Sequence, residues 1–518
     1  MTDEQLDGGA SATSIRGRAY TSGRPRHADG VEVAPATPAD LQRYTDAAAA
    51  LGQMQVPVLV SRDRPNERLF VAVLDGTNND RNNTDMGPQT GVAQIFQQIR
   101  DQETSGQVSN VAAGYLRGPG TQTGWLGVPG TIDGVRGHTF EERTETMYRQ
   151  FIEQSGRWLA ENPNADIRVA AIGFSRGAEQ AAYFTRLVDE RGIQDPTGAV
   201  YTTNNEGLVT GVNYTRPPLV EPGQVIQAAV LQDPVATGDP RNYDRRLPPS
   251  VVSALQITAR DETRDQFVGT PHLPGGMSDG NRSLNVTVPG AHSNIGDGYV
   301  ANGLGVRNTN MTMQYLNGLV DNGQPLLQMR PEPQDQNLNV IHDSEGHLSL
   351  IYTRRGFDRD GVRDENTQLG PTTYVTGPRG GQFPAPVPDE HRIREPMDQG
   401  LSGQLGYRAL PMAPVPELPG RRADAGELVP TNTAALFDQL ANRALANDAA
   451  GMCAVGDRYI NLPPQQNWLQ EGRAFNLEQA SQRDREQAAA QIAQPQVAQP
   501  QILPPAIEES QPQRAMGR

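Results

Sequence analysis

Residues 167–177 read IRVAAIGFSRG, and this stretch decides which fold the rest of the chain must fit. The apolar run 167–172 predicts a buried β-strand, and a helical pattern begins at once, over 177–190. The pattern G-x-S-x-G, centred on Ser175, stands between them. A strand that turns sharply into a helix raises a serine hydroxyl above the sheet, where the hydroxyl can act as a nucleophile. The stretch therefore predicts a catalytic Ser175, against the alternative of a chance match in a glycine-rich chain.

Similar apolar runs elsewhere in the chain indicate a parallel sheet. They occupy residues 69–74, 225–231 and 284–288, and helical patterns lie over 41–53 and 141–161. Continuous apolar strands suit a sheet that is covered on both faces, and strand–helix alternation is typical of the α/β class. The pattern therefore predicts an α/β fold: a mostly parallel sheet with helices on both faces.

Composition excludes several classes of protein. The 518 residues include 45 Lys and Arg against 60 Asp and Glu, and a net charge of −15 argues against a nucleic-acid partner. No apolar run reaches the length of about 18 residues that a membrane-spanning helix needs. Residues 1–30 lack the apolar core of a Sec-type signal peptide. The single cysteine, Cys453, excludes an internal disulfide and a multi-cysteine zinc site.

Composition also divides the chain. Residues 1–40 are polar and aperiodic and predict a disordered arm, and residues 41–355 hold the strand and helix patterns of a catalytic domain. Within this domain, residues 192–222 are polar and turn-rich and predict an insertion. Residues 356–475 are expected to form an irregular Pro/Gly-rich extension with a short helical part. Residues 476–518 form a Gln-rich, low-complexity tail, a possible secretion signal.

A serine nucleophile needs a base, and the base needs an acid that orients it. His292 follows the strand 284–288 and is the predicted base, with His342 as the alternative base. Asp233 follows the strand 225–231 and is the predicted acid. Two other aspartates compete for that role. We interpret Asp261 as structural and Asp297 as a residue that shapes its loop.

Two backbone N–H groups should face the negative charge that develops on the substrate. One is the N–H of Arg176, at the start of the helix. The other is expected from Gly76 or Thr77, after the strand 69–74, with Asp75 fixing the loop. A simple Asp-Gly turn is the alternative for this loop. Among the flanking residues, Gly173 and Gly177 are expected to permit the close backbone approach at the serine turn.

One charged stretch raises the question of a metal. Residues 358–365, DRDGVRDE, resemble a truncated calcium-binding loop but lack its full spacing and its terminal glutamate. A solvated charged loop is the default interpretation. The prediction is therefore no metal and no cofactor, with calcium as the alternative at this stretch.

Taken together, six motifs resemble the α/β-hydrolase domain family that includes the type VI secretion phospholipase effectors. They occur in the family's order over roughly residues 66–355 and are LDGTN at 74–78, GFSRGA at 173–178, DPV at 233–235, DETR at 261–264 with Phe267, PGAHS at 289–293 with Gly298 and Tyr299, and HDS at 342–344. Three departures stand out. The family usually has DTV at 233–235 and often GGGY at 296–299, and its histidine near the DETR block is missing at 255–256.

The resemblance implies a Ser-Asp-His esterase that acts on membrane phospholipids, with Ser175, Asp233 and His292 in these three roles. It implies a secreted antibacterial lipase or phospholipase, made in the bacterial cytoplasm without a Sec signal and exported by a dedicated machine to the target-cell envelope. The expected partners are membrane phospholipid, a cognate immunity protein and the secretion machinery. The Gln-rich end also loosely resembles the tails of antibacterial effectors that type IV machines export.

Two other functions stay open from the sequence. The protein could be a cytosolic esterase or thioesterase for small esters, which the missing signal peptide would fit. It could also be a non-catalytic module that kept the hydrolase fold for interaction or delivery. No long amphipathic helix offers a bilayer contact, so contact with lipid would fall to loops such as 116–130, which includes Leu116 and Trp125, or to the insertion 192–222.

Overall fold

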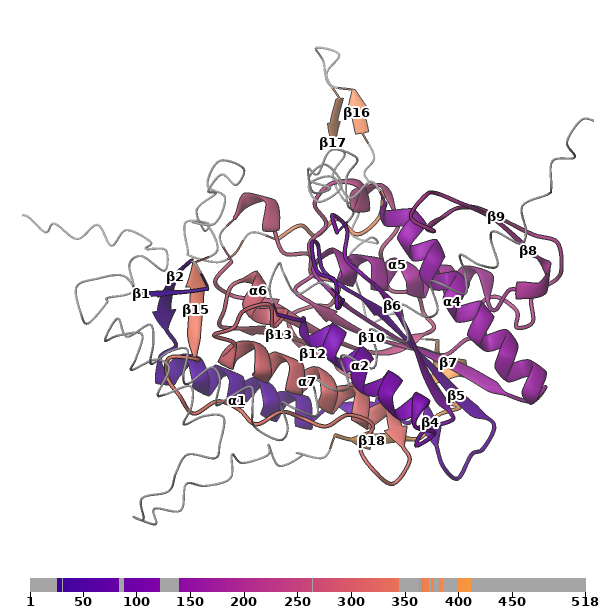
Figure 1. Ribbon diagram of the computed structural model, residues 1–518, viewed down its shortest axis with the longest axis horizontal. Helices are drawn as coiled ribbons and strands as arrows, with labels where there is room; N and C mark the ends of the chain where they lie inside the picture. Colours follow the sequence, from indigo (N-terminus) through magenta and orange to yellow (C-terminus); the bar gives the residue numbers. More distant parts are fainter. Residues whose placement is uncertain are drawn as a thin grey trace, which may run out of the picture. The chain divides into compact units, whose positions relative to one another are not determined.

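A seven-stranded sheet lies at the centre of the chain (Figure 1). In this computed structural model the strand order is β12-β13-β11-β10-β7-β5-β6, and only β12 runs antiparallel to its neighbour. The strands are β5 (Glu67–Leu74), β6 (Val111–Leu116), β7 (Asp166–Phe174), β10 (Gln227–Gln232), β11 (Val251–Ala259), β12 (Gly276–Met277) and β13 (Ser283–Val288). The predicted mostly parallel sheet is confirmed.

The structure describes part of the chain, and every described residue lies in one compact unit, Met1–Gly420. The described residues are 26–29, 31–82, 88–121, 139–262, 264–343, 363, 365–371, 374–376, 382–384 and 398–410. Within these ranges no helix is both long and apolar enough to cross a bilayer. The predicted Gln-rich tail, 476–518, lies outside them.

Helices cover both faces of the sheet, as predicted (Figure 1). One apolar core joins the sheet to α1 (Pro38–Gly52), α2 (Gly91–Thr104) and α7 (Gly303–Leu319), and a second core joins it to α4 (Phe140–Glu161) and α5 (Arg176–Arg191). Successive side chains of β5 belong alternately to the two cores. Val71 belongs to the first core and Phe70 to the second, because successive side chains of a strand point to opposite faces.

Shorter elements surround this sandwich. The predicted insertion, residues 192–222, contains the hairpin β8–β9. Two short α-helices, three 3₁₀ helices and several small sheets complete the described structure. Their bounds are β1 (Arg26–Ala28), β2 (Val31–Pro35), β3 (Gln55–Pro57), β4 (Val60–Ser61), η2 (Pro196–Gly198), β8 (Ala199–Thr203), β9 (Val209–Tyr214), η3 (Asp239–Asn242), η4 (Asp265–Phe267), α6 (His292–Ile295), β14 (Val320–Asp321), β15 (Val340–Asp343), β16 (Tyr374–Thr376), β17 (Gln382–Pro384), α8 (Gln399–Ser402) and β18 (Tyr407–Ala409).

The structure corrects the expectation of a disordered arm over residues 1–40. Residues 26–40 form β1, β2 and the start of α1, and β2 pairs with both β1 and β15. Pairing with β15, some 300 residues later, gives β2 its backbone partners, and Val33 and Ala34 are buried against the core. This long-range pairing leaves no local periodicity, so the segment looks disordered in the sequence. Residues 1–25 lie outside the described part.

The expected boundary of the catalytic domain at residue 355 is also wrong. β18 pairs with β3, and Leu401 and Leu410 belong to the core beneath α1, α2 and α7. Residues 365–371 and 398–410 are therefore part of the same packed unit as the sheet. The chain returns to its own core after a long Pro/Gly-rich stretch, and proline and glycine density alone does not reveal that return.

Five elements of the sandwich, β6, β11, β12, α2 and α7, are missing from the sequence prediction. β11 shows the reason clearly. Its run of apolar residues is interrupted by Ser253 and Gln256, which are nevertheless buried. Ser253 donates a hydrogen bond to the Arg282 carbonyl at 2.8 Å, and the Gln256 amide oxygen accepts one from the His272 N–H at 2.8 Å. Because these polar groups have partners inside the protein, the strand tolerates them.

We predict that Leu410→Ala destabilises the whole sandwich. Leu410 is 3% exposed and packs on α7, so removing its side chain should lower the free energy of unfolding by about 2–5 kcal/mol. Urea unfolding followed by tryptophan fluorescence measures the change. Leu219→Ala, at a leucine that is 43% exposed, is the matched control and should change stability little. An unchanged unfolding midpoint for Leu410→Ala would contradict the extended domain boundary.

Candidate active site

Ser175 lies at the bend between β7 and α5, where its backbone φ is 61° and its ψ is −127°. This region of φ and ψ is one that residues with a side chain rarely adopt. The bend is also closely packed. A Cβ atom on Gly177 would lie 2.2 Å from the Leu74 carbonyl oxygen, and one on Gly173 would lie 2.1 Å from the Gly177 carbonyl oxygen. The close approach that the G-x-S-x-G pattern predicts is therefore present at both glycines.

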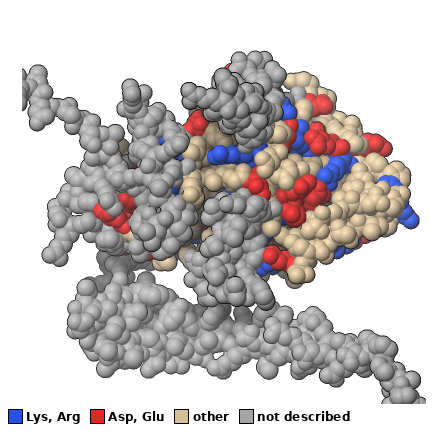
Figure 2. Space-filling model, turned by 90° about the horizontal axis from the view of Figure 1, so that it is seen from above, with Lys and Arg blue, Asp and Glu red and all other residues tan. Residues whose placement is uncertain are grey.

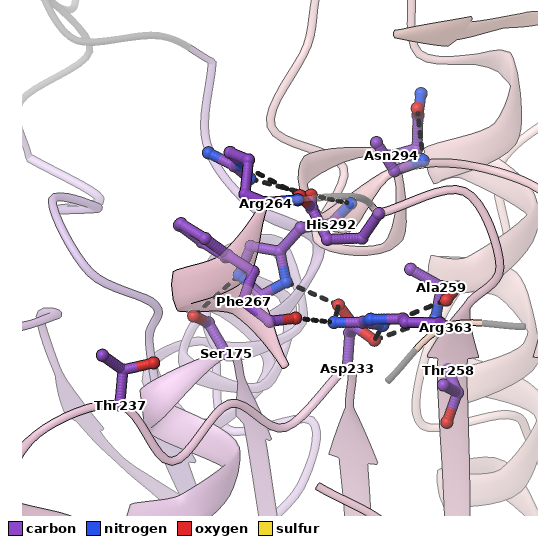
Figure 3. A network of polar contacts seen from close by, with 12 residues as sticks. Ser175, Asp233, Thr237, Thr258, Ala259, Arg264, Phe267, His292, Asn294 and Arg363 are labelled. Carbon is purple, nitrogen blue, oxygen red and sulfur yellow. Dashed lines mark hydrogen bonds and ion pairs between the residues drawn. The ribbon is translucent and has the colours of Figure 1, made fainter. Parts of the chain in front are cut away.

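Three of the predicted site residues meet in one hydrogen-bonded chain (Figure 3). The Nε2 atom of His292 lies 2.7 Å from Ser175 Oγ, and its Nδ1 atom lies 2.6 Å from Asp233 Oδ2. Each residue follows a strand of the parallel sheet, so all three lie at the carboxyl edge of that sheet. All three are buried. This arrangement allows the imidazole to take a proton from the serine while the carboxylate orients the ring.

The loop that carries His292 is held by the DETR block. The His292 N–H donates a hydrogen bond to Glu262 Oε2 at 3.1 Å, and the Gly290 N–H donates one to Asp261 Oδ2 at 2.8 Å. The imidazole contacts two aromatic rings, with centroid distances of 4.7 Å to Phe174 and 4.8 Å to Phe267. These contacts fix both the backbone and the ring plane of His292.

Asp233 is fully buried at the end of β10, with a φ of 41°. Its Oδ1 atom accepts a hydrogen bond from the Ala259 N–H at 2.9 Å. Burial alone raises the pKa of Asp233, but the charge of Arg363 and the hydrogen bond from His292 outweigh burial and hold the pKa at about 2. The carboxylate is therefore ionised at neutral pH and accepts the Nδ1–H of His292.

Burial is also the main influence on His292. It lowers the pKa of the imidazole below its ordinary value, although the hydrogen bond and the charge of Asp233 act in the opposite direction. A histidine with a lowered pKa is neutral at pH 7. Its Nε2 atom is then free of a proton and can accept the one on Ser175 Oγ.

The loop after β5 lies beside the serine turn. The Gly76 N–H donates a hydrogen bond to Asp75 Oδ1 at 2.8 Å, and the Asp75 carboxylate also accepts hydrogen bonds from the hydroxyls of Thr90 and Tyr115. Burial raises the pKa of Asp75 to about 6, despite these hydrogen bonds. Because the Gly76 N–H is taken by Asp75, the Thr77 N–H is the remaining candidate from this loop to act with the Arg176 N–H.

The alternative base, His342, lies elsewhere. It belongs to β15 and stacks on Tyr299 at a centroid distance of 3.6 Å. Its two ring nitrogens face Asn294 Nδ2 and Asp29 Oδ2, each at 2.9 Å. Neither nitrogen contacts Ser175, whereas His292 Nε2 does.

The two competing aspartates have other partners. Asp261 pairs with Arg260 and anchors Gly290, which agrees with its interpretation as structural. Asp297 has a φ of 61° and accepts hydrogen bonds from Arg330 and Gln94. A positive φ favours glycine. In this chain a buried, ion-paired aspartate takes that conformation instead.

Sequence reasoning missed two residues of the site. Arg363 reaches the Asp233 carboxylate and is 8% exposed, so the expectation of a solvated loop at 358–365 is wrong for this residue. Nothing in the local sequence distinguishes it from the other charges of that stretch. Glu262 was visible only as part of the DETR motif. Burial raises the pKa of Glu262, but the charge of Arg264 outweighs burial and holds it at about 2.

In the described part of the chain, no group of three or more His, Cys, Asp or Glu side chains is arranged to hold a metal ion. Residues 358–362 and 364 of the candidate calcium loop lie outside the described residues.

Part of this chain matches one known protein family. Residues 68–205 match the family described as T6SS, Phospholipase effector Tle1-like, catalytic domain. This match confirms the resemblance that the motifs predict. It includes Ser175 and stops before Asp233 and His292. No curated protein matches the chain.

Several solved structures are similar to parts of this chain. An uncharacterized protein from Pseudomonas aeruginosa is 16% identical over 54% of this chain and 49% of its own, with a TM-score of 0.34. The Tle1 effector bound to the VgrG spike of the type 6 secretion system is 20% identical over 45% of this chain and 51% of its own, with a TM-score of 0.27. Dienelactone hydrolase from Anabaena variabilis is 11% identical over 50% of this chain and 88% of its own, with a TM-score of 0.24. The chain thus matches about half the length of the first two structures.

We predict that Gly177→Ala disrupts the serine turn. The added Cβ would lie 2.2 Å from the carbonyl oxygen of Leu74, a backbone atom that cannot move aside easily. Forcing a methyl group into such a site costs about 1–3 kcal/mol, and the thermal unfolding temperature should fall accordingly. Gly275→Ala is the matched control, since a Cβ there meets nothing within 4 Å. Equal melting temperatures for the two variants would contradict the packing described here.

Proposed function

Because residues 68–205 carry the signature of the Tle1-like catalytic domain, we propose that this protein is a serine esterase that hydrolyses the acyl esters of membrane phospholipids. The observation that carries the proposal is the buried chain Ser175–His292–Asp233, with donor–acceptor distances of 2.7 Å and 2.6 Å. Distances of this size are within the reach that proton transfer from a serine nucleophile to its base requires.

The proposed reaction has two halves. In the first, Ser175 Oγ attacks the ester carbonyl carbon while His292 Nε2 takes the hydroxyl proton, and the N–H groups of Arg176 and Thr77 stabilise the oxyanion. Collapse of this intermediate breaks the acyl–oxygen bond, and His292 returns the proton to the departing lysophospholipid alkoxide. In the second half, water attacks the acyl-enzyme, again with His292 as the base. The products are a fatty acid, a lysophospholipid and free enzyme.

Three large apolar side chains of the described residues are exposed: Val300, which is 70% exposed, and two in the insertion. Within the predicted insertion, Val200 is 61% exposed and Leu219 is 43% exposed. The part of the molecule where β8 and β9 lie in Figure 1 shows broad uncharged areas between acidic and basic side chains in Figure 2. These features support the proposal that the insertion meets the bilayer interface. The other predicted contact loop, beyond Thr121, lies outside the described residues.

Delivery and restraint are part of the same proposal. A Tle1 effector is known bound to the VgrG spike of the type 6 secretion system. We infer that this protein is likewise exported by a dedicated secretion machine to act on the envelope of a target bacterium. A cell that makes such a lipase must protect its own membrane, so a cognate immunity protein that covers the mouth of the site is the expected partner.

We predict that Ser175→Ala abolishes hydrolysis. Phospholipid vesicles and p-nitrophenyl butyrate are the substrates, and a fluorophosphonate probe reports the reactive serine. The variant should lose about three to six orders of magnitude in kcat, because the nucleophile is gone while the fold remains. Ser155→Ala is the matched control, since this buried hydroxyl has no hydrogen-bond partner within the described structure and its loss should leave activity unchanged.

The outcomes separate the three functions. Release of fatty acid from vesicles that depends on Ser175 supports the phospholipase. Cleavage of the soluble ester with no action on vesicles points to the small-ester esterase. Absence of both hydrolysis and probe labelling in the wild-type protein points to the non-catalytic module and overturns the proposal.

We predict that activity persists below pH 6.5. The base must be neutral to accept the serine proton, and burial lowers the pKa of His292, so protonation should stop the reaction only below the ordinary histidine value of about 6.5. The pH profile of kcat/KM measures the midpoint of the acid limb. Circular dichroism over the same pH range is the control that the protein stays folded. An acid limb centred above pH 6.5 would contradict the burial argument.

A further inference from the structure

The side chain of Arg363 makes an unusually complete contact with the proposed catalytic acid (Figure 3). Its Nη1 atom donates to Asp233 Oδ1, and its Nη2 atom lies 3.1 Å from Asp233 Oδ2, so the two planar groups meet through both oxygens. The second N–H of each Nη atom donates to a backbone carbonyl, Nη1 to Ala259 at 3.0 Å and Nη2 to Phe267 at 2.6 Å, whereas the Nε–H has no partner within the described structure. A guanidinium held by both a carboxylate and two carbonyls has little freedom to rotate.

The segment that follows Arg363 is itself anchored to the core. The Asn366 N–H donates to the Gly269 carbonyl at 2.7 Å. Arg245 binds the same segment twice, since its backbone N–H donates to the Leu369 carbonyl at 2.8 Å and its Nη2 atom donates to the Gln368 carbonyl at 2.8 Å. The Leu369 side chain is 1% exposed. Arg363 therefore arrives at the site on a fixed piece of chain rather than as a mobile surface charge.

The contact between Arg363 and Asp233 balances a buried charge. Asp233 is 0% exposed, and a buried carboxylate without a compensating charge is strongly unfavourable. Hydrogen bonds from Ala259 and His292 satisfy some of its lone pairs, and Arg363 supplies the opposite charge. The bidentate contact also fixes the plane of the carboxylate. Oδ2 is thereby aimed at His292 Nδ1.

We propose that Arg363 is a positioning residue of the active site, which clamps Asp233 and thereby sets the orientation and basicity of His292. The inference rests on the proposed esterase function. A purely structural ion pair is the competing explanation. It predicts a loss of stability on removal of Arg363 but no change in the pH dependence of the reaction.

The charges around Asp233 and His292 determine the direction in which removal of Arg363 shifts the pH dependence of activity. The charged groups that act on Asp233 and His292 are Arg363, Glu262 and Arg264, and the last two pair with each other. Removing Arg363 leaves Asp233 as an uncompensated neighbour of the imidazole, so the imidazolium is stabilised. The carboxylate itself also binds a proton more readily. Both effects move the acid limb of activity to higher pH.

The test compares Arg363→Met and Arg363→Lys with the wild-type protein. The readouts are the pH profile of the fluorophosphonate labelling rate and kcat for p-nitrophenyl butyrate. Arg363→Met should lower kcat by about 10–100-fold, as loss of a group that orients a catalytic residue typically does, and raise the acid limb by about one pH unit. Arg363→Lys keeps the charge but loses the bidentate geometry. It should lower kcat while leaving the acid limb near that of wild type.

Arg168→Met is the matched control. Arg168 is also a buried, ion-paired arginine, but it lies near the start of β7, about 20 Å along the strand from Ser175. Its removal should lower the melting temperature and leave kcat and the pH profile unchanged. A similar loss of stability without any change in kcat or pH profile for Arg363→Met would reduce Arg363 to a structural role and overturn the inference.

Two further cases need separate interpretation: an Arg363→Met variant that does not fold, and a wild-type protein without esterase activity. If Arg363→Met does not fold, Arg363→Lys decides: a lower kcat with an unmoved acid limb supports the inference, and an unchanged kcat overturns it. Failure of the proposed function looks different, because then the wild-type protein itself shows neither labelling nor hydrolysis above the level of Ser175→Ala.

Discussion

The buried carboxylate of Asp233 is the constraint on which the site depends. A charge with no exposure to solvent must be balanced by hydrogen bonds and an opposite charge, and here each partner comes from a different part of the chain. The Ala259 N–H comes from the end of β11, the His292 ring from α6, and the Arg363 guanidinium from a segment about 130 residues after Asp233 itself. While it is buried, the carboxylate stays ionised only because these partners are in place, so the chemistry of the site is coupled to the docking of all of these elements.

The parallel sheet explains how those elements come together. β5, β7 and β10 are neighbours and run in the same direction, so the residues that follow them leave from one edge. The loop at Asp75 meets the turn at Ser175 because Gly177 lets the helix start against the Leu74 carbonyl. Likewise the Ser175 N–H donates to the Gln232 carbonyl at 2.9 Å, which ties the serine turn to the strand that carries Asp233. The distances within the site are thus set by sheet register rather than by the side chains alone.

Sequence patterns predict those elements of the fold that have a local signature, such as an apolar run or a turn motif. The apolar runs that contain Val71 and Val169 identify the central strands, and the G-x-S-x-G turn places Ser175 between a strand and a helix. α7 was missed, because its glycine, asparagine and threonine residues disfavour a helix on local grounds. In the structure Asn308 donates to the Asn294 carbonyl, and Thr312 accepts from Gln232 Nε2. Contacts with distant residues stabilise this helix, and no periodicity records them.

The contribution of the segment after residue 355 could not be predicted for a related reason. Its docking depends on two buried arginines, and each pairs with a carboxylate of the core: Arg363 with Asp233, and Arg245 with Glu179 on α5. Ion pairs do not recur at a regular spacing in the sequence. The local sequence therefore does not distinguish a buried arginine from a solvent-exposed one. Glu179 lies one turn after the nucleophile, so α5 presents the serine at its start and holds the late segment through its first turn. The same helix therefore couples the nucleophile to the part of the chain that delivers the clamp on Asp233.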